Sequence, residues 1–540
     1  MAVESGLTFQ HVNGMSDQFY LAEIMGPGVA LLDYDGDGDL DVYAVQGGAL
    51  GTGMGGGTGA GASAGDRLYR NDLVIAADGT PHLRFTDVTV QSRIAVAGYG
   101  MGVAAGDVDN DGRVDLFVSR LGRNVLLRNQ GDGTFADVSR TSGIGHTDWA
   151  VSASFVDYDR DGWLDLYVAN YVEYRVESDT DCFAASGAPN YCSPATYRPT
   201  VDRLYRNRRN GTFEDVTTGS GIATAVGPGL GVVATDVNRD GWPDIYVAND
   251  GAANFLWMNQ RNGTFVEQGL ASGAALSGDG KPEGSMGVAA ADVDDDGDDD
   301  LFMTHIAGEG HNLYVNDGSG VFEDRSTPAG LSQATLALTG FGGGWIDVDN
   351  DGTLEIFAAS GAIQPIPALV ARGDPYPLAQ PMQLLRRVGE RFADASAQAG
   401  APFAVPAVGR GVALGDVDND GDTDIVVAHS NGPLRLLRNN VGQSWRWLGL
   451  RFVDRPNGRD LVGARVEVQT GGTTRWRRAH ADGSYASSSD PRVIVGLGQA
   501  SGTSRVRVTW PDGVSESWNT LAGNRYHTLV RGTAAEGSGR

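Results

Sequence analysis

One nine-residue pattern, with carboxylates at positions 1, 3, 5 and 9 and glycine at position 6, occurs seven times in the 540-residue chain. The seven copies hold 32 of the 68 acidic residues. Oxygen ligands at this spacing, with a sharp turn at glycine and a main-chain carbonyl at position 7, suit one hard cation such as Ca²⁺. An ion-free acidic turn is the alternative for a single copy. Seven copies with the same spacing favour calcium.

The predicted ligands occupy positions 1, 3, 5, 7 and 9, and position 7 contributes its carbonyl oxygen. Two copies deviate, with Asn238 at position 3 and Glu355 at position 9, but both residues still offer an oxygen. We therefore expect up to seven Ca²⁺ ions. The ligands are Asp33, Asp35, Asp37, Asp39, Asp41; Asp107, Asp109, Asp111, Arg113, Asp115; Asp157, Asp159, Asp161, Trp163, Asp165; Asp236, Asn238, Asp240, Trp242, Asp244; Asp292, Asp294, Asp296, Asp298, Asp300; Asp347, Asp349, Asp351, Thr353, Glu355; and Asp416, Asp418, Asp420, Asp422, Asp424.

Strands must position these loops, because each loop is flanked by small and β-branched residues, as in GVALL before Asp33 and LDVYAV after it. Most copies are followed by a tail of the form Asn-x-x-x-Gly-x-Phe, which predicts a second hairpin. Four strands per unit correspond to one propeller blade. The seventh unit lacks the phenylalanine tail, and we expect residues 5–12, with Phe9, to complete that blade. The predicted fold is all-β, with a seven-bladed β-propeller over residues 1–440.

The remainder of the chain differs in charge. Alternating β-rich runs predict a β-sandwich-like domain over residues 441–532 and a flexible tail over 533–540. Residues 441–540 carry 14 arginines and 8 acidic residues, whereas the net charge of the whole chain is −27. The opposite signs of the two parts predict that the C-terminal domain docks on the propeller.

The repeats and their tails resemble the FG-GAP/VCBS repeats of integrin α-subunit propellers. GARVEV (463–468), VGLG (495–498) and VTWPDG (508–513) resemble an ASPIC/UnbV domain. Together they resemble the cartilage acidic protein family and its bacterial UnbV relatives. This resemblance implies a secreted calcium-binding propeller with a small appended β domain. It implies little about ligand or activity.

Residues just before the predicted inner strands would surround the mouth of the central channel. They include the candidates for a binding or acid–base pocket, although simple loop packing is the alternative for all of them. Long insertions at 47–66, 170–203 and 360–384 would border the same face. The pocket candidates are Glu23, Tyr99, His146, Asp148, Glu283 and Arg410.

The charge of the chain bears on which partners it can have. The strong net negative charge disfavours nucleic acid and anionic membranes as main partners, and we expect no membrane span and a monomer.

Cys182 and Cys192 either close a disulfide in an oxidising compartment or remain free thiols. The sequence MAVESGLTF has no signal-peptide character, so either a signal peptide has been removed from a secreted or periplasmic protein or the protein is cytoplasmic.

The predicted function is an extracytoplasmic binding or interaction module in which calcium is structural. Its partner would be a protein, a glycan or a small molecule. The alternative is a calcium-dependent lyase, cyclase or isomerase of secondary metabolism, with its active site at the channel mouth.

Overall fold

The computed structural model describes residues 2–50, 65–455 and 457–534. Within these ranges the chain forms seven successive antiparallel sheets, the fourth and fifth of which are joined into one eight-stranded sheet, followed by a separate pair of sheets. Most of the 47–66 insertion, residues 51–64, lies outside the described residues. Of the predicted tail at 533–540, only residues 533 and 534 are described.

Each of the first six sheets has four main strands in the order of the sequence, as expected for a propeller blade. The innermost strands are β1 (Val29–Leu32), β7 (Tyr99–Gly106), β11 (Ala150–Val156), β17 (Gly229–Thr235), β21 (Glu283–Ala291), β25 (Gly340–Ile346) and β29 (Gly409–Gly415). The second strands are β2 (Asp41–Ala44), β8 (Asp115–Leu121), β12 (Asp165–Asn170), β18 (Asp244–Ala252), β22 (Asp300–His305), β26 (Glu355–Ser360) and β30 (Asp424–His429).

The outer half of each blade comes from the predicted tail hairpin. The third strands are β3 (Arg67–Asn71), β9 (Val125–Asn129), β15 (Arg203–Asn207), β19 (Phe255–Asn259), β23 (Asn312–Asn316), β27 (Gln383–Val388) and β31 (Arg435–Leu437). The fourth strands are β6 (Phe85–Asp87), β10 (Phe135–Asp137), β16 (Phe213–Asp215), β20 (Phe265–Glu267), β24 (Phe322–Asp324) and β28 (Arg391–Asp394). The tail phenylalanines are buried between neighbouring blades, as in the cluster that joins Phe135 to β1 residues.

The innermost strands contact one another in a closed ring, because β1 touches both β7 and β29 and every other neighbour in the series is also in contact. At the closing point, Gln10 forms one antiparallel bridge with Pro433. Phe9 and Leu7 are buried between the last and first blades. The strand expected at 5–12 is therefore represented by a single bridge and by core packing, and the last sheet has three strands among the described residues.

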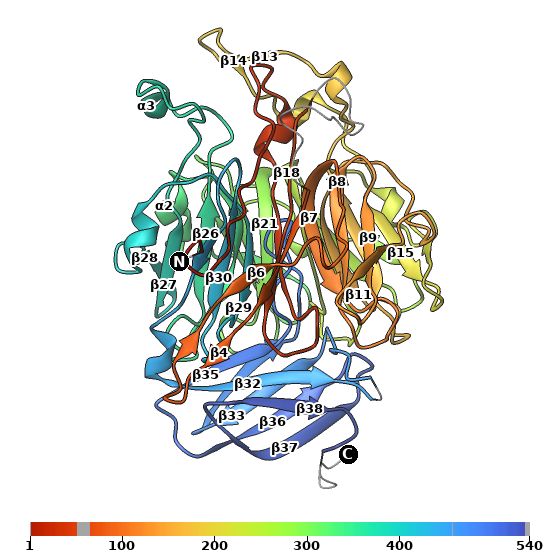
Figure 1. Cartoon of the computed structure of the whole chain (residues 1–540), viewed down its shortest axis with the longest axis vertical. Helices are drawn as coiled ribbons and strands as arrows, with labels where there is room; N and C mark the ends of the chain where they lie inside the picture. Colours follow the sequence, from red (N-terminus) through yellow and green to blue (C-terminus); the bar gives the residue numbers. More distant parts are fainter. Residues whose placement is uncertain (1, 51–64, 456, 535–540) are drawn as a thin grey trace.

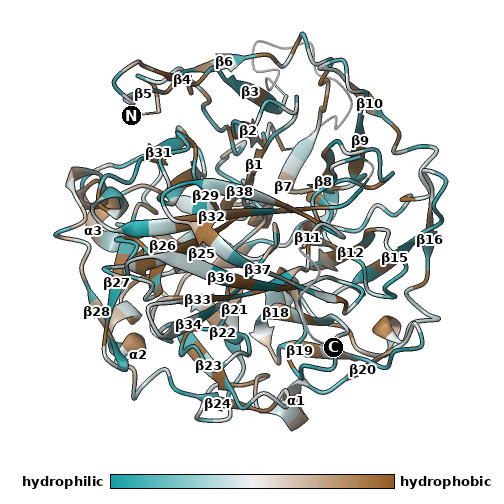
Figure 2. Cartoon of the chain, turned by 90° about the horizontal axis from the view of Figure 1, so that it is seen from below, coloured by the Kyte–Doolittle hydropathy of each residue, from teal (hydrophilic) through white to brown (hydrophobic). Residues whose placement is uncertain are grey.

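The C-terminal domain contains two facing sheets that enclose a core of their own. One sheet has the order β35-β32-β38 and the other β34-β33-β36-β37. Seen from below, these strands cross the centre of the ring of blades (Figure 2). The strands are β32 (Arg446–Val453), β33 (Arg465–Thr470), β34 (Thr473–Arg478), β35 (Val493–Gly498), β36 (Thr503–Thr509), β37 (Ser515–Ala522) and β38 (Tyr526–Val530).

The short elements β13 (Cys182–Phe183), β14 (Pro189–Asn190) and α3 (Pro367–Val370) lie at the end of the propeller opposite the C-terminal domain, whereas β4 (Val74–Ile75) lies near that domain (Figure 1). Cys182 and Cys192 form a disulfide in the insertion that contains β13 and β14. No helix among the described residues is long and apolar enough to cross a membrane. The remaining elements are β5 (Pro81–His82), α1 (Gly269–Ser272), α2 (Leu331–Thr335), and 3₁₀ turns η1 (Leu21–Ile24), η2 (Val176–Ser178), η3 (Pro194–Thr196), η4 (Ile222–Thr224), η5 (Ala401–Ala404) and η6 (Gly442–Ser444).

Candidate metal centres

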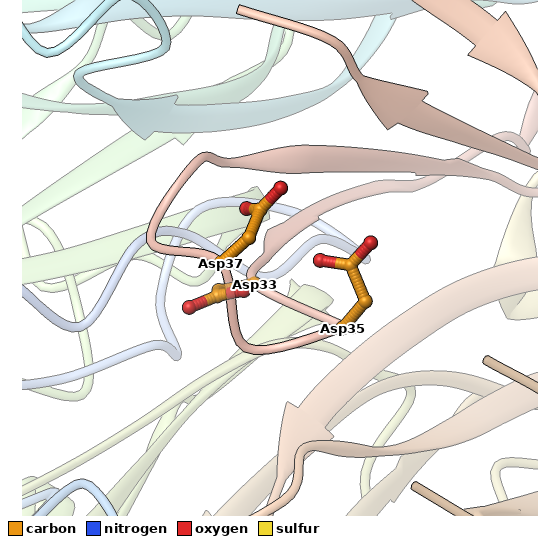
Figure 3. Close-up of side chains that lie close together, drawn as sticks. All are labelled: Asp33, Asp35 and Asp37. Atoms are coloured by element: carbon orange, nitrogen blue, oxygen red, sulfur yellow. The ribbon is translucent and has the colours of Figure 1, made fainter. Parts of the chain in front are cut away.

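The seven acidic loops connect the first strand of each blade to the second, all at one end of the propeller. Figure 3 shows the first loop, where Asp33, Asp35 and Asp37 lie close together. In at least five loops, three carboxylate oxygens lie within 4.8 Å of one another. These triads are Asp33, Asp35 and Asp37; Asp107, Asp109 and Asp115; Asp157, Asp159 and Asp165; Asp292, Asp294 and Asp300; and Asp347, Asp349 and Asp351.

The loops share one internal pattern of hydrogen bonds. In all seven, the glycine amide at position 6 donates to the carboxylate at position 1 over 2.8–3.1 Å. The amide at position 7 donates to the carboxylate at position 5 over 2.7–3.3 Å. The glycine is needed, because its φ lies between +86° and +95° in every loop. These bonds preorient the carboxylates around one point.

The carboxylate at position 9 joins each loop to the blade behind it. One of its oxygens accepts the amide of position 2 over 2.9–3.3 Å in all seven loops. In six blades its other oxygen accepts the amide of an asparagine at or just beyond the end of the third strand, over 2.7–2.9 Å. Position 9 therefore fixes the loop as well as offering an oxygen.

The same asparagine joins neighbouring blades, a role that the sequence analysis missed. Its side-chain amide donates to the position-2 carbonyl of the preceding blade over 2.7–2.9 Å. The repeated tail motif was the available signal, because the asparagine opens it. The sixth blade differs, since Arg387 donates there to the carbonyl of Val293. The asparagines are Asn71, Asn129, Asn207, Asn259, Asn316 and Asn439.

We expect Asn207→Ala to lower the free energy of unfolding by about 2 kcal/mol, because it leaves the buried carbonyls of Val108 and Leu164 without their donor. Asn210→Ala is the matched control in the same hairpin. Asn210 is exposed and accepts only from Thr212, so a loss of a few tenths of a kcal/mol is expected. Chemical denaturation of both variants measures the difference. Equal losses would contradict the role of Asn207 between blades.

The seventh loop is the most buried of the set. Asp416, Asp418, Asp422 and Asp424 each have 0% exposure. Both carboxylate oxygens of Asp418 and of Asp422 are buried without a hydrogen-bond partner. Burial, and then the neighbouring carboxylates, raise the pKa of Asp418 to about 7 and that of Asp422 to about 8. Arg438 lies 3.5 Å from Asp418 and compensates part of the negative charge of this loop. Asp422, buried without a donor, still requires a cation or a proton, so the donor set of this loop fits a calcium ion.

Side chains of the C-terminal domain cover the loops. The Tyr526 hydroxyl donates to Asp416 over 2.8 Å, and the ring of Trp447 packs against Gly421, where an added Cβ would lie 1.7 Å from it. Arginines of this domain donate to main-chain carbonyls of the loops, as Arg475 does to Asp351 and Arg492 to Asp416, over 2.8 and 3.0 Å. The two domains thus meet through the acidic loops, with arginine against carbonyl dipoles and carboxylates.

The channel-mouth candidates are divided among different environments. Glu23, Tyr99 and Arg410 are buried among aromatic residues. Glu23 accepts the amide and the hydroxyl of Ser16 over 3.0 and 2.7 Å, and the Tyr191 hydroxyl lies 3.2 Å from its other oxygen. Burial raises the pKa of Glu23 to about 7, although these hydrogen bonds oppose that shift.

The other three candidates lie in two groups, because Arg203, the partner of Asp148, also lies 3.6 Å from Asp215, the partner of His146. His146 lies 2.8 Å from Asp215, and Asp148 pairs with Arg203 over 2.8 Å. Glu283 accepts from Asn312 over 2.7 Å, and its carboxylate lies 3.8 Å from the buried His305. The described contacts therefore do not join the six candidates into one site. Long-range packing decides these partners, and residue type along the chain gives no signal for it.

Comparison with known proteins agrees with this architecture. The FG-GAP-like repeat family model matches residues 33–118, 107–168, 178–247, 236–303 and 292–358, and an FG-GAP repeat model matches 408–445. The ASPIC and UnbV model matches 454–536. Human cartilage acidic protein 1 is 27% identical over 530 residues, which cover 93% of this chain and 71% of that protein. The mouse protein is 28% identical, covering 90% and 70%.

Solved structures similar to this chain include propellers of low sequence identity. The Dos1 propeller is 7% identical with a TM-score of 0.37, covering 82% of this chain and 97% of that one. YCF48 bound to D1 peptide is 8% identical with a TM-score of 0.41, covering 80% and 94%. The family assignment rests on the repeats, whose matches span more than half of the sequence. This chain belongs to the FG-GAP-like repeat family and ends in an ASPIC and UnbV domain.

Proposed function

We propose that the acidic loops bind calcium and that the ions serve to stabilise the propeller. The observation that carries this proposal is the seventh loop, where the carboxylates of Asp418 and Asp422 are buried without a hydrogen-bond donor. Arg438 lies 3.5 Å from Asp418, whereas Asp422 has no ion pair among the described residues. Like charges at such distances repel strongly unless a cation compensates them. Calcium accepts six to eight oxygens in flexible geometry, which suits loops whose position-7 residue varies from Asp to Trp. The seven-fold repetition of the internal hydrogen bonds supports the same role for each loop.

We propose further that the protein is a binding module that acts outside the cytoplasm. The disulfide between Cys182 and Cys192 supports this location, because such bonds persist in oxidising compartments. The C-terminal domain covers the loop face, so the opposite face is the one available to a partner (Figure 1). That face carries the insertions at 170–203 and 360–384, with the exposed side chains of Phe183 and Val370. Scaffold-held loops of this length commonly bind partners.

A binding screen with matched variants tests this proposal. The full chain, in calcium buffer, is applied to a glycan array and to a panel of extracellular proteins. For the partner found, Phe183→Ser is expected to weaken binding at least about tenfold, the effect of one lost interface contact of about 1.4 kcal/mol. Val74→Ser is the control, because Val74 is equally exposed (61% against 63%) but lies in the separate β4–β5 hairpin.

Two outcomes would contradict the proposed binding face. One is a folded, calcium-loaded protein that binds neither class of partner. The other is binding that Phe183→Ser and Val370→Ser leave unchanged while Val74→Ser weakens it. The enzyme alternative has no comparable support, because Glu23, Tyr99 and Arg410 are buried among packed side chains.

A further inference from the structure

A loop of the C-terminal domain enters the centre of the propeller. This channel loop, residues 481–490, lies between β34 and β35. It bridges β1 in a parallel sense, with Ser488 opposite Ala30, and β21 in an antiparallel sense, with Ser484 opposite Val288. Both strands are innermost strands of blades on different sides of the ring. The loop therefore occupies the space that the innermost strands surround.

The main chain of the channel loop forms hydrogen bonds with the innermost strands of four blades, β1, β7, β21 and β29. The donor–acceptor distances lie between 2.6 and 3.1 Å. Strands at the inner edge of a blade have unpaired amides and carbonyls, which need partners when they are buried. The pairs are Ser484 with Val288, Ala486 with Val103, Ser488 with Val29 and Leu31, and Asp490 with Leu414.

Serine hydroxyls of the loop satisfy further amides of the inner strands. Four amides donate to these hydroxyls over 3.1–3.2 Å. Ser487 and Ser488 are 5% and 2% exposed. A hydroxyl can accept and donate at once, so a serine-rich segment suits a channel lined by amides. The pairs are Val29 with Ser487, Ala105 with Ser488, Gly343 with Ser484, and Leu414 with Ser489.

Tyr485 forms the tip of the loop. Its side chain is fully buried, its hydroxyl donates to the carbonyl of Met25 over 2.8 Å, and its ring meets Phe341 edge to face at 5.0 Å. Asp482, near the entrance, accepts the hydroxyl of Ser154 over 2.6 Å and the amide of Ala234 over 2.8 Å. The loop is thus held along its whole length, from entrance to tip.

Glycines on the inner strands make room for the loop. An added Cβ at Gly28 would lie 1.8 Å from the carbonyl oxygen of Ala486, and one at Gly102 would lie 2.7 Å from the same atom. A methyl group cannot fit at either position without displacing the loop. The blades and the loop are therefore complementary in shape as well as in hydrogen bonding.

We infer that the propeller channel is a binding site for a turned, serine-rich peptide loop with one tyrosine, and that this chain fills the site with its own residues 481–490, where Gly483, Ser484 and Ala486 have positive φ. The C-terminal domain is consequently joined to the propeller as an internal ligand, in addition to the contacts of its arginines. The occupied channel gives a partner no passage through the ring. This inference does not depend on the identity of any metal in the acidic loops.

Hydrogen exchange of the full chain, followed by mass spectrometry in calcium buffer, tests the inference. Peptides covering 481–490 are expected to exchange as slowly as those of β21, roughly a thousandfold more slowly than the exposed turn at 499–502. A loop of the C-terminal domain that only rested on the propeller would exchange as fast as that turn. Such fast exchange in the wild-type chain would overturn the inference.

A pair of serine variants tests whether the channel loop stabilises the innermost strands. Ser488→Ala removes the acceptor for the Ala105 amide, so exchange in peptides of β1 and β7 is expected to rise at least about tenfold. Ser501→Ala is the matched control, because Ser501 is an exposed serine of the same domain. If Ser488→Ala raised exchange in the C-terminal domain alone, and left β1 and β7 unchanged, the channel would not be the loop's binding site.

Discussion

Removal of calcium with EGTA is expected to lower the Tm of this protein by more than about 10 °C, because the proposed calcium ions would bind the folded loops and not the unfolded chain. The seventh loop is expected to be affected most, because four of its carboxylates have 0% exposure. Without an ion, burial and mutual repulsion oppose their charged forms. Differential scanning calorimetry in calcium, in EGTA and after calcium is restored measures the effect. An unchanged Tm in EGTA would exclude calcium as a structural component.

A pair of variants at position 3 connects this effect to single loops. In calcium, Asp418→Asn is expected to lower the Tm by about 5 °C, since it weakens a ligand in the buried seventh loop. Asp35→Asn, at the same position of the first loop, is expected to have a smaller effect because Asp35 is exposed. In EGTA the sign for Asp418→Asn reverses, because the amide removes one of the repelling charges. A decrease of equal size in both buffers would contradict metal binding at Asp418.

The repeats made most of the fold predictable. Carboxylates at positions 1, 3, 5 and 9 with Gly at 6 predict a hairpin turn, and strand-like flanks such as GVALL predict a strand on each side of it. The same local logic, repeated seven times, gives seven sheets. The closing segment was predicted less well, because a single bridge from Gln10 to Pro433 replaces a regular strand. Residues 5 and 6 contact β6 instead, where the Phe85 amide donates to the carbonyl of Ser5.

The contacts between domains could not be read from local patterns. The charge difference predicted docking, but it does not specify that Arg475 and Arg492 bind loop carbonyls. The channel loop, ADGSYASSSD, has neither helical nor strand periodicity, so its binding role follows only from the strands around it. Likewise, Glu23 and His146 share a predicted place before inner strands but have unrelated partners in the fold.

Arg410→Met is expected to lower the free energy of unfolding by about 3–5 kcal/mol, because several buried carbonyls lose their donor at about 1–3 kcal/mol each. The guanidinium is fully buried, and its Nε atom donates to the carbonyl of Ile24 over 2.6 Å. Its Nη atoms donate to the carbonyls of Gly361, Gly409 and Ala362. It also stacks on Phe341, with its central carbon 3.8 Å from the ring centroid. Methionine fills the space but leaves these carbonyls without their donor.

Arg410→Lys separates charge from geometry, because lysine keeps the positive charge but lacks the planar fork that reaches several carbonyls at once. It is expected to recover less than half of the loss. Arg123→Met, at an exposed arginine, is the control for charge removal and should change stability by no more than about 0.5 kcal/mol. Denaturation in urea measures all three variants. If Arg410→Met and Arg123→Met lowered stability equally, Arg410 would not be the residue that holds η1 and the 360–384 insertion together. Phe341, which contacts both Arg410 and the tip of the channel loop, would then be supported by other residues.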